Sequence, residues 1–127
     1  MVCDGLGTPL AAAVGPGQQH ESQQAIPLLE EATAWPEQPA KVAGDKAYSA
    51  GWLREWLRER GITPVIAHPQ TEHERTRRFD KASYRRRNVV ERCVNSLKWF
   101  RRVATRYDKL ATHYLAMVTI AIIFRLL

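Results

Sequence analysis

The chain has 127 residues, 45% of them hydrophobic and 25% charged, which is ordinary for a globular protein and fits one domain with one core rather than a disordered chain. The net charge of +6 is uneven, with an acidic excess in residues 1–50 and a larger basic excess in residues 51–127, so the second half suits a polyanion or, equally, presents a solvated basic surface. Cys3 and Cys93 have no Cys-x-x-Cys partner, which argues against a disulfide framework or zinc ribbon and favours a reducing, cytoplasmic location.

The first elements expected along the chain are two short strands and a helix. Met1–Cys3 and Leu10–Val14 form the strands, and Asp4–Gly7 is the turn between them. Apolar residues at helical spacing follow from Ser22 to about Ala34, after which prolines end the helix.

A strand, a helix and a second strand are expected in the middle of the chain. Lys41–Gly44 is a short strand that runs directly into Asp45. Ser49 is expected to cap an amphipathic helix from Ala50 to Arg60, and Ile62–Ala67 follows as another strand.

The last third of the sequence is first basic and then strongly apolar. Residues 68–83 are expected to form a basic loop, followed by helices over about 84–101 and 111–127. The apolar stretch that begins at Tyr114 is interrupted at Arg125, short of the roughly 20 residues needed to cross a bilayer. We therefore expect a buried final helix and no membrane partner, and we expect no signal peptide, because glycines interrupt the N-terminus early. The order of elements indicates a mixed α/β layout.

One polar stripe on the expected helix 84–101 combines an aromatic ring, a carboxylate and two cations. On a helix turning about 100° per residue, its members lie within about 60° of one another, apart from the apolar stripe. They are Tyr84, Arg87, Glu91 and Lys98. A solvated face with an ordinary Arg87–Glu91 pair explains the same pattern, so geometry alone leaves both interpretations open.

Asp45 is the second candidate site residue. It directly follows a short strand, and sheets of α/β proteins commonly place functional side chains at the carboxyl ends of their strands. A turn aspartate, or a cap for the next helix, would produce the same sequence.

These residues carry a resemblance to a known family. The segment from Gly44 to Ser49 resembles the one that holds the second aspartate of insertion-sequence-five-like bacterial DDE transposases. Residues 3–22 resemble their hairpin and the loop after it, and residues 101–110 resemble their basic run after the glutamate helix. The signature around their last acidic residue is matched by Tyr84-x2-Arg87-x3-Glu91-x6-Lys98. The resemblance covers nearly all of residues 1–127 and implies a single catalytic domain of ribonuclease-H-like fold, a mixed sheet flanked by helices.

The resemblance also implies a chemistry, namely metal-dependent DNA cleavage and strand transfer during transposition. Asp45 and Glu91 would be catalytic residues and ligands of two Mg²⁺ or Mn²⁺ ions. Arg87 and Lys98 would hold phosphates, and Tyr84 would stack on or hydrogen-bond the transposon end. Further contacts to the DNA backbone are expected from Arg75, Arg77, Arg78, Arg85, Arg86, Arg101, Arg102 and Lys109.

One departure from the family concerns its first catalytic aspartate, which lies on a strand before the hairpin. Asp4 matches the hairpin turn instead. We therefore expect a truncated domain that lacks the first strand and has little activity alone, completed by an upstream reading-frame product or a homo-oligomer. An alternative function is a non-catalytic DNA-binding or dimerisation module, which needs the basic residues but neither carboxylate.

Overall fold

The computed structural model describes residues 1–16, 19–34, 37–68, 79–105 and 109–127. Their contacts divide the chain into two compact units, where the composition suggested one core. The hairpin unit comprises residues 1–19 and 88–127, and the central unit comprises residues 20–87. Helices and short strands alternate as expected, and the described strands pair as two two-stranded sheets, one in each unit. The mixed α/β class is therefore confirmed.

The hairpin unit begins with the expected pair of antiparallel strands. Strand β1 (Val2–Cys3) pairs with β2 (Pro9–Ala11), which is shorter than predicted. Asp4 makes the turn, because its Oδ1 accepts hydrogen bonds from the backbone N–H groups of Leu6 at 2.9 Å and Thr8 at 2.8 Å. Desolvation of the Asp4 carboxyl raises its pKa, but these backbone hydrogen bonds lower it more, so the net shift is downward. Asp4 is thus a turn residue, as the sequence indicated.

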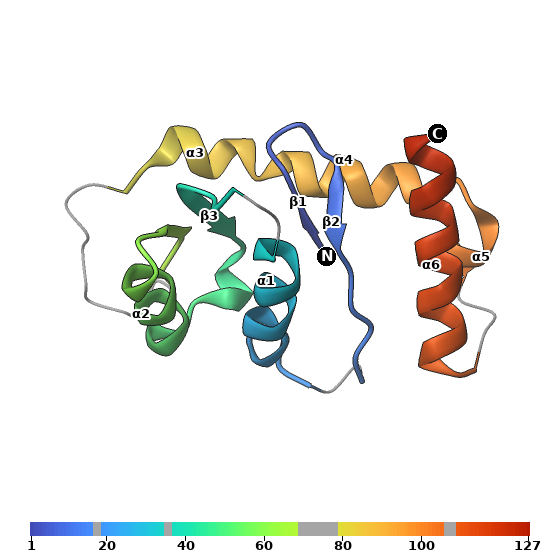
Figure 1. Cartoon of the computed structure of the whole chain (residues 1–127), viewed down its shortest axis with the longest axis horizontal. Coiled ribbons are helices and arrows are strands. Elements are labelled where there is room, and N and C mark those ends of the chain that lie inside the picture. The colour runs from blue at the N-terminus through green and yellow to red at the C-terminus, as the bar shows by residue number, and fades with distance from the viewer. Residues whose placement is uncertain (17–18, 35–36, 69–78, 106–108) are drawn as a thin grey trace. The chain divides into compact units, whose positions relative to one another are not determined.

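Three helices complete the hairpin unit: α4 (Asn88–Leu97), α5 (Arg101–Thr105) and α6 (Ala111–Leu126). In Figure 1, α6 lies beside α5, and both helices contact each other closely. The core of the unit is formed by Ala11, Cys93, Leu97, Val118 and Ala121, all buried.

Helix α6 forms where it was predicted, but only part of it is buried. Val118 and Ala121 face the core, whereas Ile123 is 52% exposed and Phe124 is 64% exposed. The prediction of a buried helix is therefore wrong for much of its surface, because the helix is apolar on nearly all sides and the unit covers only one of them. Among the described residues, no helix has the length and hydrophobicity needed to cross a membrane.

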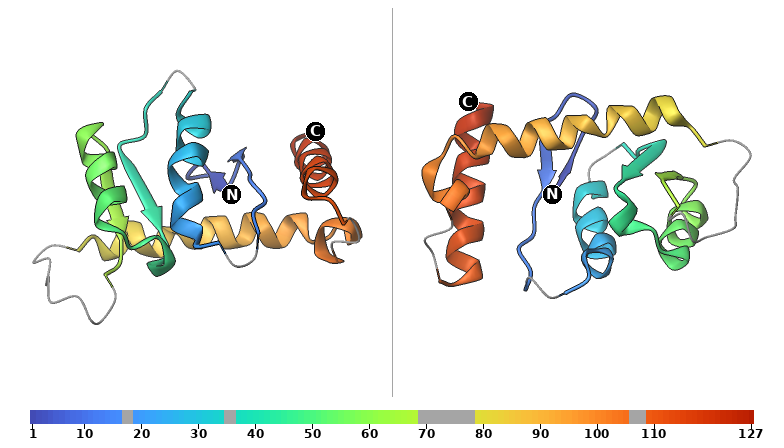
Figure 2. Two further views of the ribbon diagram at one scale, coloured as in Figure 1. Left: turned by 90° about the horizontal axis from the view of Figure 1, so that it is seen from below. Right: turned by 180° about the vertical axis from the view of Figure 1, so that it is seen from behind.

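The central unit is built on a parallel strand pair. Its strands are β3 (Lys41–Gly44), with the predicted bounds, and β4 (Thr63–Ile66), with Lys41 opposite Thr63 and Gly44 opposite Ile66. The helical elements are η1 (Glu21–Gln24), α1 (Ala25–Thr33), η2 (Lys46–Tyr48), α2 (Gly51–Glu59) and α3 (Lys81–Arg86), where η denotes a 3₁₀ helix. Figure 2 shows β3 between α1 and α2. The buried apolar residues are Ala25, Leu28, Leu29, Ala32, Leu53, Leu57, Ile62, Val65 and Ile66.

Helix α2 differs from the prediction at its start and agrees with it at its end. Ser49 does not cap it, since the N-cap is Ala50 and no side-chain hydrogen bond caps the helix. The Ser49 hydroxyl oxygen instead accepts a hydrogen bond from Arg54 Nη2 at 2.8 Å. At the other end, Gly61 follows the C-cap residue Arg60 with φ +72°, a left-handed conformation that glycine adopts readily.

The single helix predicted over residues 84–101 is divided, and its start lies earlier than predicted. Helix α3 begins at Lys81 because Asp80 caps it, accepting the Ser83 N–H at 2.9 Å on its Oδ1. The predicted basic loop 68–83 therefore ends before Lys81, and residues 69–78 lie outside the described part of the chain. Arg87 separates α3 from α4, and α4 ends at Leu97.

Candidate active site

Asp45 lies at the carboxyl end of β3, directly before η2. Its backbone is extended, with φ −68° and ψ 165°, and its side chain makes no capping hydrogen bond. The turn is held by backbone atoms, since the Tyr48 N–H donates to the Asp45 carbonyl oxygen at 2.9 Å. The Asp45 side chain is 57% exposed. A capping role therefore does not explain this carboxylate, whose oxygens are accessible to a ligand.

Arg87 is the cation beside Asp45. Its Nη1 lies 3.9 Å from Asp45 Oδ2, and the guanidinium also lies over the Tyr84 ring at 5.3 Å from the ring centre. The Tyr84 ring in turn contacts Phe79 at a centroid distance of 5.2 Å. Both Tyr84 and Arg87 are intermediate in exposure. The structure thus brings three predicted site residues together in the central unit: Asp45, Tyr84 and Arg87.

Tyr48 and Glu21 also belong to this neighbourhood, and the sequence analysis assigned neither to the site. Burial raises the pKa of the half-buried Tyr48 phenol, and the negative charges of Glu21 and Asp45 raise it further. Tyr48 also shares a side-chain hydrogen bond with Glu21. Tyr48 follows Asp45 by three residues, so one 3₁₀ turn brings it to the same side of the chain. That spacing was the signal available in the sequence.

Glu91 and Lys98 belong to the hairpin unit. Glu91 is exposed in the first turn of α4, where a carboxylate is favourable beside the helix N-terminus. Lys98 follows the last residue of the same helix and is exposed. The opposite, apolar stripe of α4 is buried at Cys93 and Leu97, as predicted. Glu91 and Asp45 thus lie in different units.

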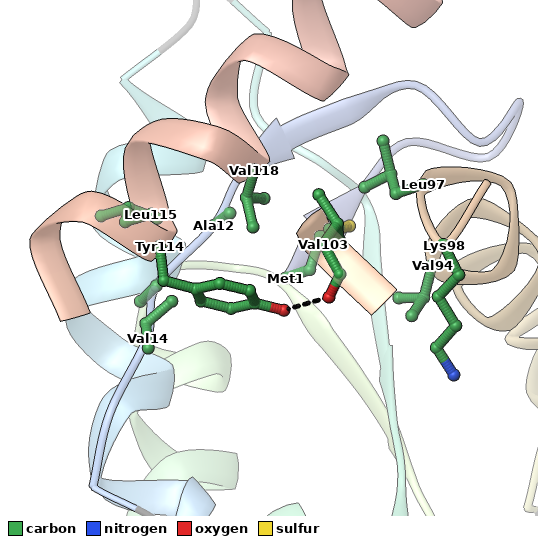
Figure 3. A pocket seen from close by; sticks show the side chains of 11 residues that line it. Met1, Ala12, Val14, Val94, Leu97, Lys98, Val103, Tyr114, Leu115 and Val118 are labelled. Carbon is green, nitrogen blue, oxygen red and sulfur yellow. Dashed lines mark hydrogen bonds between the residues drawn. The ribbon is translucent and has the colours of Figure 1, made fainter. Parts of the chain in front are cut away.

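The Lys98 side chain also borders an apolar cavity in the hairpin unit, with a volume of about 170 Å³. In Figure 3, Lys98 lies across this cavity from Tyr114, whose hydroxyl donates to the Val103 carbonyl oxygen at 2.8 Å. The remaining lining residues are apolar: Met1, Ala12, Ala13, Val14, Val94, Leu97, Leu115 and Val118. These remaining residues supply no acid, base or nucleophile for catalysis.

The arginines expected to contact the DNA backbone are partly described. Arg85 and Arg86 on α3 and Arg101 on α5 are exposed, and so is Lys109. Arg92 on α4 is exposed next to Glu91 and is a further cation that the sequence analysis did not single out. Arg102 belongs to α5, but its side chain is outside the described set. Outside the described residues altogether are Arg75, Arg77 and Arg78.

The chemistry of the donor set fits a divalent metal ion. Carboxylate oxygens are the ligands that Mg²⁺ prefers, and Mg²⁺ is usually held by one or two carboxylates together with substrate phosphates. Asp45 and Glu91 supply such oxygens. Within the described residues no three His, Cys, Asp or Glu side chains cluster as a ready-made metal site. Each carboxylate, within its own unit, is thus a donor of the kind that needs substrate and further ligands to hold such an ion.

Comparison with known proteins gives matches to transposases. A family described as "Transposase DDE domain" matches residues 1–126. A protein of Burkholderia cepacia, named as a transposase for insertion sequence element IS402, is 34% identical over 121 residues, covering 87% of this chain and 53% of its own length. A protein of Brucella ovis, named as a transposase for insertion sequence element IS6501, is 29% identical over 122 residues, covering 94% of this chain and 89% of its own length. The chain thus spans about half the length of the first of these relatives. No solved structure matches it.

Proposed function

Since this chain belongs to the family of transposase DDE domains, we propose that it forms part of an enzyme that cleaves DNA at transposon ends and joins the cut ends to target DNA. The observation that carries the proposal is the Asp45 carboxylate. It is accessible at the end of β3, free of any capping role and next to Arg87. A carboxylate and a guanidinium side by side provide a metal ligand and a phosphate-binding group at one place.

Asp45 and Glu91 would hold the divalent ions, Mg²⁺ or Mn²⁺. Two such ions stabilise the attacking and leaving oxygens of an in-line displacement at phosphorus. Arg87 and Lys98 would bind phosphate oxygens near the scissile bond, Arg87 through its planar fork and Lys98 as a point charge. Tyr84, whose ring lies beside the Arg87 guanidinium, would contact the transposon end.

The proposal includes a ribonuclease-H-like sheet and a third carboxylate. The spacing from Tyr84 to Lys98 supports the insertion-sequence-five-like branch of the family. In that family the third carboxylate precedes the hairpin. Asp4 is not assigned this role, because its Oδ1 accepts the two backbone hydrogen bonds that form the hairpin turn. Full activity would then require the strand that carries this residue, from the same polypeptide, an upstream reading-frame product or a second copy.

The experiment that tests the site uses the complete transposase that contains this chain, a DNA duplex with the transposon ends, and Mg²⁺. Asp45→Asn and Glu91→Gln are each expected to reduce strand joining by several orders of magnitude, while the exposed Glu59→Gln is the matched control and keeps the parental rate. Parental joining by Asp45→Asn would show that the assigned ligand is wrong.

A second candidate function is a non-catalytic DNA-binding module. The exposed Arg85, Arg86 and Arg101 favour it, because they offer phosphate contacts without any need for carboxylates. It predicts salt-sensitive binding to duplex DNA that Asp45→Asn and Glu91→Gln leave unchanged, in a protein that joins no strands even when complete. Measuring binding and joining on the same preparations distinguishes the two functions.

A further inference from the structure

Two ion pairs join α3 to β3, one at each end. At the start of the strand, Lys41 Nζ lies 2.7 Å from Asp80 Oδ2. Just beyond its end, Asp45 Oδ2 lies 3.9 Å from Arg87 Nη1. Lys41 is the first residue of β3 and Asp80 is the N-cap of α3, whereas Asp45 directly follows β3 and Arg87 directly follows α3. The strand and the helix therefore run alongside each other in the same direction.

The lengths of the two elements are compatible with this pairing. Four residues of strand, from Lys41 to Asp45, advance by about 13 Å at about 3.3 Å per residue. Seven residues of helix, from Asp80 to Arg87, rise by about 10 Å at 1.5 Å per residue. The difference is within the reach of long Lys and Arg side chains. Fixing the start of α3 against Lys41 therefore places Arg87 close to the level of Asp45.

The pair at the start is the tighter of the two. Besides Lys41, the Asp80 carboxylate accepts the Ser83 N–H at 2.9 Å and the Ser83 hydroxyl at 2.6 Å. Lys41 Nζ also lies 3.3 Å from the Ser83 hydroxyl oxygen. The hydrogen bonds from Lys41 and Ser83 hold the pKa of Asp80 well below its usual range. Asp80 thus stays ionised at neutral pH, and it ties the first turn of α3 to β3.

We propose that Lys41 and Asp80 are positioning residues, which hold α3 in register along β3 so that Arg87 lies beside the metal-binding carboxylate of Asp45. This inference rests on the proposed function of Asp45 as a metal ligand. While Arg87 is held there, its positive charge opposes a cation at Asp45. When a phosphate of the substrate arrives with the ion, the same guanidinium is already in place to bind it. Loss of the Lys41–Asp80 pair lets Arg87 move away from Asp45.

The test measures Mn²⁺ binding to the complete chain by the loss of the free-ion signal in electron paramagnetic resonance. Arg87→Gln is expected to tighten Mn²⁺ binding by about two- to fivefold, the range for a partly exposed ion pair. Lys41→Met is expected to tighten it by part of that factor, and the double substitution by no more than Arg87→Gln alone. Asp80→Asn should act like Lys41→Met, because asparagine keeps the helix cap but lacks the charge.

Two further variants control for charge and folding. Arg58→Met removes an exposed cation of the central unit that has no role in the proposed site, and it should leave Mn²⁺ affinity near the parental value. Lys41→Arg keeps the ion pair and should behave as the parent. If Lys41→Met changes Mn²⁺ affinity equally in the parent and in Arg87→Gln, the positioning role is overturned. The change in affinity would then come from the loss of a positive charge and not from a movement of Arg87. If Asp45→Asn leaves Mn²⁺ binding unchanged, the metal-ligand assignment itself falls, and the positioning role with it.

Discussion

Arg54 fastens helix α2 to the segment next to Asp45, and its replacement by methionine gives a quantitative prediction. Arg54 is 5% exposed, and its Nη2 donates to the Ser49 hydroxyl oxygen at 2.8 Å and to the Ile66 carbonyl oxygen at 3.4 Å. Ile66 is the last residue of β4. Methionine fills a similar volume with apolar atoms but can donate neither hydrogen bond.

The expected loss follows from these two contacts. A hydrogen bond from a charged donor contributes about 1.5–3 kcal/mol, and the 2.8 Å bond is of normal length, whereas the 3.4 Å bond is long and contributes little. Removing a buried guanidinium also removes its desolvation cost, which offsets part of the loss. We therefore expect Arg54→Met to lower the free energy of unfolding by about 1–2 kcal/mol, and Tm by about 3–8 °C.

Thermal unfolding followed by circular dichroism tests this, with hydrogen exchange of the β4 amides to locate the effect. Arg58→Met is the matched control, because Arg58 lies on the same helix and its side chain is 55% exposed in a 3.8 Å pair with Glu55. It should change stability by less than about 0.5 kcal/mol. An unchanged or higher Tm for Arg54→Met would refute the reasoning, since desolvation would then outweigh the hydrogen bonds.

Three further predictions concern the turn, the pH dependence and the DNA contact. Gly7→Ala should lower the free energy of unfolding by about 1–2 kcal/mol, because Gly7 has φ +90° and an added Cβ would lie 3.3 Å from Val89 Cγ1. Chemical denaturation measures this loss, and an unchanged denaturation midpoint would contradict it. The folded-state pKa of Asp80 is lowered from 3.8, so its stabilising effect is complete above that pH and is lost as the pH falls below it. The unfolding free energies of the parent and Asp80→Asn should therefore converge gradually in acid, and a gap that stays constant or widens as the pH falls below 3.8 would speak against the Lys41 contact. Arg87→Gln should reduce the slope of log affinity for duplex DNA against log salt by about 0.9, and an unchanged slope would exclude its phosphate contact.

The first and last residues of the strand that precedes Asp45 could be predicted, because residue types that seldom continue a strand flank it on both sides. Lys41–Gly44 is bounded by a proline two residues earlier and by a charged residue after it, and the structure has the same bounds. The N-cap at Asp80 had a signal in the sequence too, since aspartate is one of the residues that commonly precede the first turn of a helix. The prediction instead relied on the polar stripe of residues 84–98, and it therefore placed the start of α3 at about residue 84 rather than at Lys81.

The Asp45–Arg87 pair could not be predicted, because it depends on how α3 packs. A helical wheel places Arg87 near Tyr84, and the two side chains do lie together, although Arg87 follows the last residue of α3. The position of that helix along β3 is set by Lys41 and Asp80, which are 39 residues apart in sequence. Likewise, the hydrophobicity of α6 indicates a helix but not how many of its sides find a partner.

Arg125 Nη1 donates to the Gly7 carbonyl oxygen at 2.8 Å, across 118 positions of sequence. During translation, β1 and β2 leave the ribosome long before Arg125, which binds the turn between them, has been synthesised. The central unit is continuous in sequence, whereas the hairpin unit joins residues 1–19 to residues 88–127 and is complete only after α6 has been synthesised.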